Sequence, residues 1–304
     1  MHSLVFLAVI ISATCLVNHD EENVGVSTSP ILLNYIFNLV MRADNLAQRV
    51  KKLEKIITDS ETKIERVEPF KMLAQGPQQS CHHALQQGYF DSTFYYIKPT
   101  LAKRPFLVLC DMETLRGGWT YVLNRYNGSQ KFDLPWHYYK HGFGNINGDF
   151  WLGLDSLHYL TGDQNNELFV ELEDWNSDKA YALYDSFEVG DEDEGYMLKK
   201  LGGYQGSAGD SFSDSLGSKF STLDHNRDPQ TFECVFKKNA GWWFRNCSES
   251  LLTGEYYEES EMFEKRDGIY WTTFRGKNYY LKHAKMMIRP APLTRMLQSP
   301  ESTV

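Results

Sequence analysis

The residues from Asp224 to Asp228 have the types and the spacing of a cation site. Oxygen-bearing side chains stand at every second position, with Asn226 between the two aspartates. Such oxygens can converge on a hard cation, and calcium suits them because it takes roughly six to eight oxygen ligands. The same residues also form ordinary turns, because Asp and Asn side chains bond to nearby backbone groups. The residues alone leave both interpretations open.

A cysteine pair follows this turn. A disulfide between Cys234 and Cys247 would close a small loop and hold it rigid. Inside the loop, Trp242 and Trp243 follow a glycine, and aromatic side chains commonly line ligand pockets. The acidic turn, the cysteine loop and the aromatic pair together predict a binding site rather than a catalytic one.

Composition and missing motifs exclude several classes of function. The chain has 304 residues and a net charge of −9 at neutral pH, so it lacks the basic excess that neutralises phosphates in nucleic-acid binding. The sequence holds no Gly-x-Ser-x-Gly, no His-Glu-x-x-His, no phosphate loop and no dinucleotide-binding motif. We therefore expect a protein that is not an enzyme and does not bind nucleic acid.

The amino-terminal residues predict secretion. Residues 4–11 form an apolar run that is too short to span a bilayer, and we place a signal peptide at 1–15 and a leader at 16–30. Cleavage after Cys15 would leave four of the five cysteines, a number that suits an oxidising compartment. Cleavage one residue earlier would leave Cys15 free to cross-link subunits. No later stretch reaches the ~20 apolar residues of a membrane span.

Residues 31–67 carry apolar side chains at heptad spacing. The two columns are Ile36, Ala43, Val50, Ile57 and Ile64, and Leu39, Leu46, Leu53, Ser60 and Val67. This pattern predicts an α-helical coiled coil that pairs with copies of itself as a parallel dimer or trimer. The alternative is one amphipathic helix that packs on its own domain. Pro69 stops the run, and residues 68–79 form a linker.

The pattern from residue 80 to residue 292 differs from that of the helix. Short apolar runs recur between glycine-bounded turns, and Leu168, Val170 and Leu172 alternate as in a strand. A short helix is expected at residues 156–160, with Ser156 as its cap and Gly162 near its end. These features predict an α+β domain with a largely antiparallel sheet, followed by a tail at 293–304.

Two sequences fit the formula for N-glycosylation. Asn127 begins Asn-Gly-Ser in an expected turn, which is a plausible acceptor in a secreted protein. Asn246 begins Asn-Cys-Ser, but its cysteine is expected in a disulfide and its asparagine in a pocket wall. We expect Asn127 to be used and Asn246 to remain unmodified.

The domain resembles the fibrinogen-like C-terminal domains of fibrinogen, ficolins, tachylectins, angiopoietins and insect fibrinogen-related proteins. The resemblance runs from about Ser80 to Pro290 and keeps the family's order of motifs. The motifs are Gly-Gly-Trp-Thr at 117–120, Gly-Phe-Gly-Asn at 142–145, Asp-Phe-Trp-Leu-Gly-Leu-Asp at 149–155, Gly-Asp-Ser-Phe at 209–212, Asp-Gly-Ile-Tyr-Trp at 267–271 and Met-Met-Ile-Arg-Pro at 286–290. It implies the family's α+β fold, the fibrinogen C-terminal-like domain.

The resemblance also implies disulfides and a calcium site. Four cysteines allow three pairings, and the family selects Cys81–Cys110 and Cys234–Cys247. The calcium ligands implied by the family are the side chains of Asn226 and Asp228 and the main-chain carbonyls of Gln230 and Phe232. The family usually has aspartate where this chain has Asn226, and the loss of one negative charge predicts weak calcium binding.

The implied ligand pocket differs more strongly from the family. Its positions fall on Lys238, Trp242, Asn246, Ser248, Lys265, Arg266 and Lys277. If the basic side chains converge, the pocket should prefer an anionic carbohydrate or protein ligand; if they point into water, they are ordinary surface residues. The family also implies a cis peptide bond between Asn246 and Cys247.

Two functions follow from the resemblance. The first is a secreted, multivalent, lectin-like protein of innate immunity that binds glycans or microbial surfaces through its heads. The alternative is an extracellular signalling or structural protein that docks a receptor protein through the same domain, as angiopoietin-like members do. Tethered heads would strengthen either interaction, because a second engagement becomes intramolecular.

Overall fold

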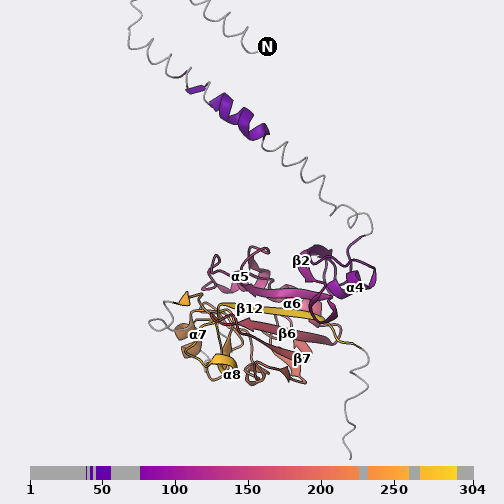
Figure 1. Cartoon of the computed structure of the whole chain (residues 1–304), viewed down its shortest axis with the longest axis vertical. Helices are drawn as coiled ribbons and strands as arrows, with labels where there is room; N and C mark the ends of the chain where they lie inside the picture. Colours follow the sequence, from indigo (N-terminus) through magenta and orange to yellow (C-terminus); the bar gives the residue numbers. More distant parts are fainter. Residues whose placement is uncertain are drawn as a thin grey trace, which may run out of the picture. The chain divides into compact units, whose positions relative to one another are not determined.

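The computed structural model describes residues 39, 42–43, 46–55, 76–225, 232–259 and 268–292 (Figure 1). The chain divides into two compact units, Met1–Phe70 and Lys71–Val304. The predicted signal peptide, leader and tail lie outside the described residues. None of the helices formed by the described residues has the length and apolar character that a membrane crossing needs.

The described part of the first unit is helical. Residues 46–55 form a continuous helix, as the heptad pattern predicts for this segment. Its apolar seam faces solvent, because Leu46, Val50 and Leu53 are exposed by 62%, 48% and 58%. An exposed apolar stripe of this kind is stabilised when a second helix covers it. Self-association through the seam remains a prediction.

Replacing Val50 with aspartate is expected to convert the oligomer to monomers. The substitution places a charge in the apolar seam without breaking the helix, and an unpaired buried charge is strongly unfavourable. Sedimentation velocity of the full chain would measure the change. Lys52→Asp, on the same helix but outside the two seam columns, should leave the oligomer intact. A monomeric wild-type chain would contradict the coiled coil.

The second unit, which we call the head, is built on one antiparallel sheet of the described residues. The main path of this sheet runs in the order β1, β2, β3, β12, β6, β7, β8, while β4, β5 and β9 pair off this path. The bounds are β1 Phe94–Ile97, β2 Phe106–Asp111, β3 Trp119–Arg125, β4 Phe143–Gly144, β5 Phe150–Trp151, β6 Asn166–Glu173, β7 Lys179–Val189, β8 Leu198–Gly202, β9 Gln205–Gly206 and β12 His283–Pro290. A separate pair consists of β10 Ser250–Leu251 and β11 Tyr270–Trp271. The predicted α+β class with a largely antiparallel sheet is confirmed.

Strand β6 shows how the sequence pattern selects the faces of the sheet. Leu168, Val170 and Leu172 are fully buried in the main core, as their alternation predicts. Phe169 lies on the other face in a small cluster with Trp119. This alternation is the two-residue period of a strand, so each face of the sheet receives every second residue.

Acidic and basic side chains cover that second face. Strands β6 and β12 pair in register there, and three opposed pairs make contacts: Glu167–Arg289 at 3.0 Å, Glu171–Lys285 at 3.0 Å and Glu173–His283 at 3.3 Å. The two partly exposed pairs, Glu171–Lys285 and Glu173–His283, each contribute less than about 1 kcal/mol, whereas Glu167 is fully buried. Together they favour this register, because a shift by one residue would place these side chains on the core face.

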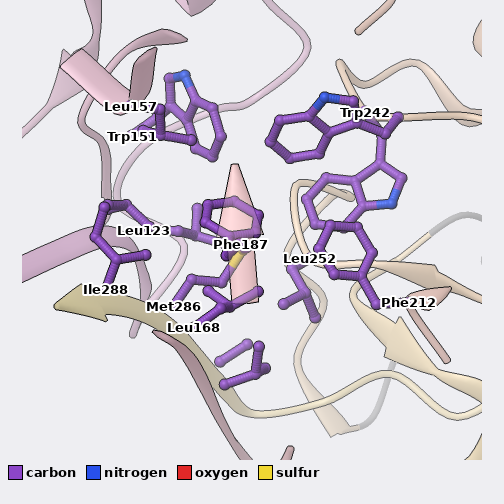
Figure 2. Packing of buried hydrophobic residues seen from close by; sticks show 14 of the residues in the cluster. Leu123, Trp151, Leu157, Leu168, Phe187, Phe212, Trp242, Leu252, Met286 and Ile288 are labelled. Atoms are coloured by element: carbon purple, nitrogen blue, oxygen red, sulfur yellow. The ribbon is translucent and has the colours of Figure 1, made fainter. Parts of the chain in front are cut away.

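The main core is rich in aromatic residues, and Figure 2 shows part of it. Phe212 and Trp242 pack with their ring centroids 5.3 Å apart. The ring centroids of Trp151 and Trp243 are 6.2 Å apart. The Trp243 indole N–H donates to the Tyr196 carbonyl at 2.7 Å. Burial without a lost hydrogen bond makes Trp243 strongly stabilising. The core thus holds both tryptophans of the cysteine loop.

Short helices border the sheet. They are α4 Cys81–Gln86, α5 Trp136–His141, α6 Leu154–Thr161, α7 Phe232–Lys238 and α8 Thr272–Arg275, with 3-10 turns at Thr114–Arg116 and Ser213–Ser215. Figure 1 places α4 and β2 at one end of the head and α7 and α8 at the other. The predicted cap Ser156 was wrong, because α6 begins earlier, after Gly153, while its end at Gly162 is confirmed.

Candidate functional site

The predicted disulfides are both present. Cys234, on α7, bonds to Cys247 with a Cα–Cα distance of 4.9 Å. Cys81, at the start of α4, bonds to Cys110 on β2, and both are fully buried. The first bond ties α7 to the segment before β10. It therefore joins the segments that carry two of the predicted pocket positions, Lys238 and Asn246.

The backbone around the fourth cysteine differs from the prediction. The Asn246–Cys247 peptide bond is trans, so the implied cis bond is wrong. Instead, Asn246, Cys247 and Ser248 all have left-handed φ angles of 48°, 60° and 59°. For residues with side chains each such angle costs on the order of 1 kcal/mol or more, so the surrounding contacts must impose this path.

Tyr270 and Ser248 supply some of these contacts. The Tyr270 hydroxyl lies 3.1 Å from the carbonyl oxygen of Cys247 and 3.2 Å from that of Ser248, so it can donate to either. The Ser248 hydroxyl donates to the Trp243 carbonyl at 3.3 Å and accepts from the Arg245 N–H at 3.1 Å. Ser248 is therefore part of the support of the loop.

The pocket positions do not form one open, aromatic and basic cleft in the described residues. Trp242 and Ser248 are fully buried, so they support the site from the core and do not line its surface. Asn246 is exposed, and its place in a pocket wall remains a prediction. Lys265 and Arg266 lie outside the described residues.

Both lysines of the predicted pocket that the structure describes, Lys238 and Lys277, have partners. Lys277 bonds to Glu249 at 2.7 Å, and this hydrogen bond lowers the pKa of the Glu249 carboxyl below its usual value. The Lys238 ammonium lies 5.1 Å from the centre of the Tyr270 ring, a cation–π contact. Their charges are therefore partly compensated, which weakens the case for an anion-selective pocket.

The residues that flank the two cysteines in sequence, and Lys277, which bonds to one of these residues, carry side chains of mixed character. Phe236 on α7 is 66% exposed, and Arg245 is exposed while its guanidinium donates to the Leu216 carbonyl at 3.1 Å. We call Phe236, Arg245, Asn246, Glu249 and Lys277 the disulfide-loop surface. Sequence reasoning missed Phe236, Arg245 and Glu249, although their closeness to the two cysteines in sequence could have pointed to them.

Helix α8 holds the Lys277 side of this surface in place. The N–H and the hydroxyl of Thr272 both donate to the Glu249 carbonyl, at 2.9 and 2.6 Å. Arg275 reaches the loop after β6, where its Nε donates to Asp174 at 2.7 Å and its Nη2 to Asp178 at 2.6 Å. Asp174 is fully buried, so this ion pair anchors α8 to the sheet.

The predicted calcium ligands fall mostly outside the described residues. Asn226, Asp228 and Gln230 lie there, and Phe232 enters the described part only as the first residue of α7. Asp224 is described, and one of its oxygens accepts from the Trp136 N–H at 2.9 Å and from the Thr222 hydroxyl at 2.8 Å. Asp224 thus accepts from the N–H of the first residue of α5. The described residues hold no cluster of acidic, histidine or cysteine side chains that fits a metal ion. Calcium binding remains a prediction.

Replacing Asn226 with aspartate is expected to strengthen calcium binding, because a carboxylate restores one negative charge to the implied ligand set. A ligand that binds only the folded state raises its stability, so the calcium-induced rise in melting temperature should exceed that of the wild type. Calorimetry with calcium and with a chelator would measure it. Asn278→Asp adds the same charge at another exposed position and should not change the calcium effect. Equal responses from both variants would contradict a calcium site at this turn.

A cavity of about 250 Å³ lies beside the carboxyl end of α7. Lys237 and Lys238 line one part of it, and Gly128 and Tyr256 line another. Arg125 reaches it from β3; its guanidinium donates to two main-chain carbonyls, and burial lowers its pKa to about 10. Arg125 therefore stays charged at neutral pH. The cavity is lined by residues from both the turn after β3 and the end of α7.

Comparison with known families decides the class of the head. The model for the C-terminal globular domain of fibrinogen beta and gamma chains matches residues 77–291. The chain belongs to this family.

Relatives within the family are similar across the head. Angiopoietin-related protein 2 of Mus musculus is 43% identical over 220 residues, which cover 72% of this chain and 44% of that protein. Angiopoietin-4 of Bos taurus is 40% identical over 231 residues, covering 73% of this chain and 46% of that protein. The chain thus spans less than half the length of these curated relatives.

Two solved structures share the fold. The fibrinogen-like globe domain of human ANGPTL2 matches with a TM-score of 0.68 and 42% identity, covering 71% of this chain and 100% of that one. Lamprey fibrin D-dimer, in complex with the peptide Gly-His-Arg-Pro-amide, matches with a TM-score of 0.65 and 28% identity over 99% of this chain and 96% of that one.

Proposed function

We propose that this chain is a secreted, extracellular signalling protein that binds a protein receptor through its fibrinogen-like head. The observation that carries the proposal is the identity of 43% to angiopoietin-related protein 2 across the head. Of the two functions that follow from the sequence, this similarity supports receptor docking better than lectin activity. The peptide bound in the lamprey structure supports a protein ligand further, because it lies in a relative of the same fold.

The disulfide-loop surface is the proposed docking surface. Exposed aromatic and arginine side chains are enriched where proteins bind each other, and Phe236 and Arg245 meet this description. The Lys277–Glu249 pair gives the surface both signs of charge, which suits a partner with complementary charges. A carbohydrate pocket has less support, because Trp242 and Ser248 are buried.

Binding of the labelled full chain to cultured animal cells tests the proposal. Binding should saturate, and mild protease treatment of the cells should remove it, because the receptor is a protein. Phe236→Ala combined with Arg245→Glu should weaken binding by about tenfold or more, as the loss of a hot spot does. Tyr96→Ala removes a half-exposed aromatic side chain from β1 and should have little effect.

The competing outcome is specific. Binding that survives the protease, is lost after enzymatic removal of cell-surface glycans and is inhibited by free acetylated sugars would support the lectin function instead. Unchanged binding by the double variant would move the docking surface away from the disulfide loop.

A further inference from the structure

The turn after β3 carries the Asn127-Gly128-Ser129 sequon, which lies outside the proposed docking surface. We propose that Asn127 carries an N-linked glycan and that this glycan covers the side of the head around Tyr126. The inference rests on the proposed function in one respect, since the modification requires the secretory route. It names a modification site and the surface that the glycan closes.

The side chain of Asn127 is open to the modifying enzyme and to the glycan. Asn127 is exposed in the Asn-Gly-Ser turn. Its carboxamide oxygen accepts from the Ser129 N–H at 3.1 Å. Within the described part of the chain its carboxamide nitrogen, the atom that carries the sugar, makes no hydrogen bond. A glycan attached there would break no contact of the fold.

Contacts to the backbone fix the turn from below. The buried carboxylate of Asp149 accepts from the N–H groups of Tyr126 and Asn127, the latter at 3.2 Å. Gly128 has a φ of 70°, and a Cβ atom there would lie 2.6 Å from the Tyr256 ring. Both contacts hold the main chain and leave the Asn127 side chain outside. The fold therefore presents the acceptor asparagine on an ordered turn.

The turn lies between two hollows of the surface. Gly128 lines the cavity of about 250 Å³ beside α7. Tyr126 lines a groove of about 430 Å³ on the second face of the sheet, the one that carries the Glu171–Lys285 pair. A glycan is bulky and strongly hydrated. One chain of sugars at Asn127 would thus stand at the rim of both hollows and hinder a protein-sized partner from entering either.

The second sequon provides an internal comparison. Asn246 is also exposed, but its neighbour Cys247 is held in the disulfide, and both residues lie in the left-handed region. A glycan added there before folding would stand within the disulfide-loop surface and hinder receptor docking. Receptor docking through this surface therefore requires an unmodified Asn246.

Peptide mass spectrometry of the full chain from the medium of cultured animal cells tests the site. Release of the glycan by peptide N-glycosidase in heavy-oxygen water should convert Asn127 to labelled aspartate. Asn127→Gln and Ser129→Ala should abolish the modification, whereas Ser129→Thr preserves the sequon and should retain it. Asn246→Gln should leave the electrophoretic mobility unchanged.

Hydroxyl-radical footprinting tests the shielding. Tyr126 and Tyr96 are exposed by similar fractions, 55% and 50%, but only Tyr126 adjoins the sequon. Oxidation of Tyr126 should be at least about twofold greater in Asn127→Gln than in the wild type. Oxidation of Tyr96 should be equal in the two proteins. Equal labelling of Tyr126 in both would overturn the shielding.

The outcomes separate this inference from the proposed function. A chain in the medium whose Asn127 is unmodified overturns the glycan and leaves receptor binding untouched. A chain glycosylated at Asn127 that binds no cell-surface protein supports the glycan and overturns the proposed function. A chain that stays in the cytosol without a glycan overturns both.

Discussion

Removal of the Cys234–Cys247 disulfide is expected to abolish the proposed receptor binding, whereas removal of Cys81–Cys110 is expected to cost more stability. Cross-linking residues 29 or 13 apart in sequence removes unfolded-state entropy worth about 3.6 and about 2.9 kcal/mol, respectively. The buried Cys81 and Cys110 also lose packing when they are replaced. A loss of this size should lower the melting temperature of the head by roughly 10 °C.

Loss of the Cys234–Cys247 disulfide should weaken cell binding more than loss of Cys81–Cys110, although it should lower the melting temperature less. The Cys234–Cys247 bond holds three consecutive left-handed residues, and without the cross-link they can relax to less costly angles. Arg245, Asn246 and Glu249 would then lose their relative positions. Each pair should be replaced by two alanines, and cell binding should be measured at least about 15 °C below the melting temperature, a margin chosen from the expected shift. Equal binding by both double variants would contradict a docking role of the loop.

Replacing Arg275 with methionine is expected to destabilise the head by more than the loss of an exposed ion pair does, because it removes the cation from the buried carboxylate of Asp174. That carboxylate accepts from Arg275 at 2.7 Å and from the N–H groups of Asn176 and Asp178, each at 2.9 Å. The arginine side chain is 33% exposed, so the loss should be smaller than for a pair in which both charges are buried. Urea denaturation would measure the loss.

Asp178 provides the matched control for this prediction. It bonds to the same arginine at 2.6 Å, but its side chain is 66% exposed. Exposed ion pairs contribute less than about 1 kcal/mol, so Asp178→Ala should be nearly neutral. Adding Asp174→Asn to Arg275→Met should recover part of the lost stability, because the double variant buries no unpaired charge. Equal losses for Arg275→Met and Asp178→Ala would show that burial does not decide the effect.

Family, fold class and strand pattern were accessible from the sequence, because each rests on residue type and local spacing. The alternation of Leu168, Val170 and Leu172 predicted which side of β6 enters the core, and the structure agrees. The cysteine pairing followed from the family resemblance and is confirmed. The receptor-docking function was stated as an alternative, and the comparisons give it more support than the lectin function.

The character of the site was decided by tertiary contacts. Trp242 stood in the sequence as a pocket residue, but Phe212 and the rest of the core enclose its ring. Lys277 stood as a free cation, but chain folding brings it to Glu249, 28 residues earlier. Neither contact can be predicted from the local sequence, because the two partners of each contact are about 30 residues apart and meet only when the chain folds.

Motifs and residue patterns along the chain thus identify a fibrinogen-like head with two disulfides, preceded by a segment with a heptad pattern. Which side chains near Cys247 reach solvent, and which charges are compensated, became visible in the folded chain. Periodicity and motif spacing are properties of residues that are neighbours in the sequence. Burial and ion pairing depend on residues that are far apart in the sequence and meet only after folding.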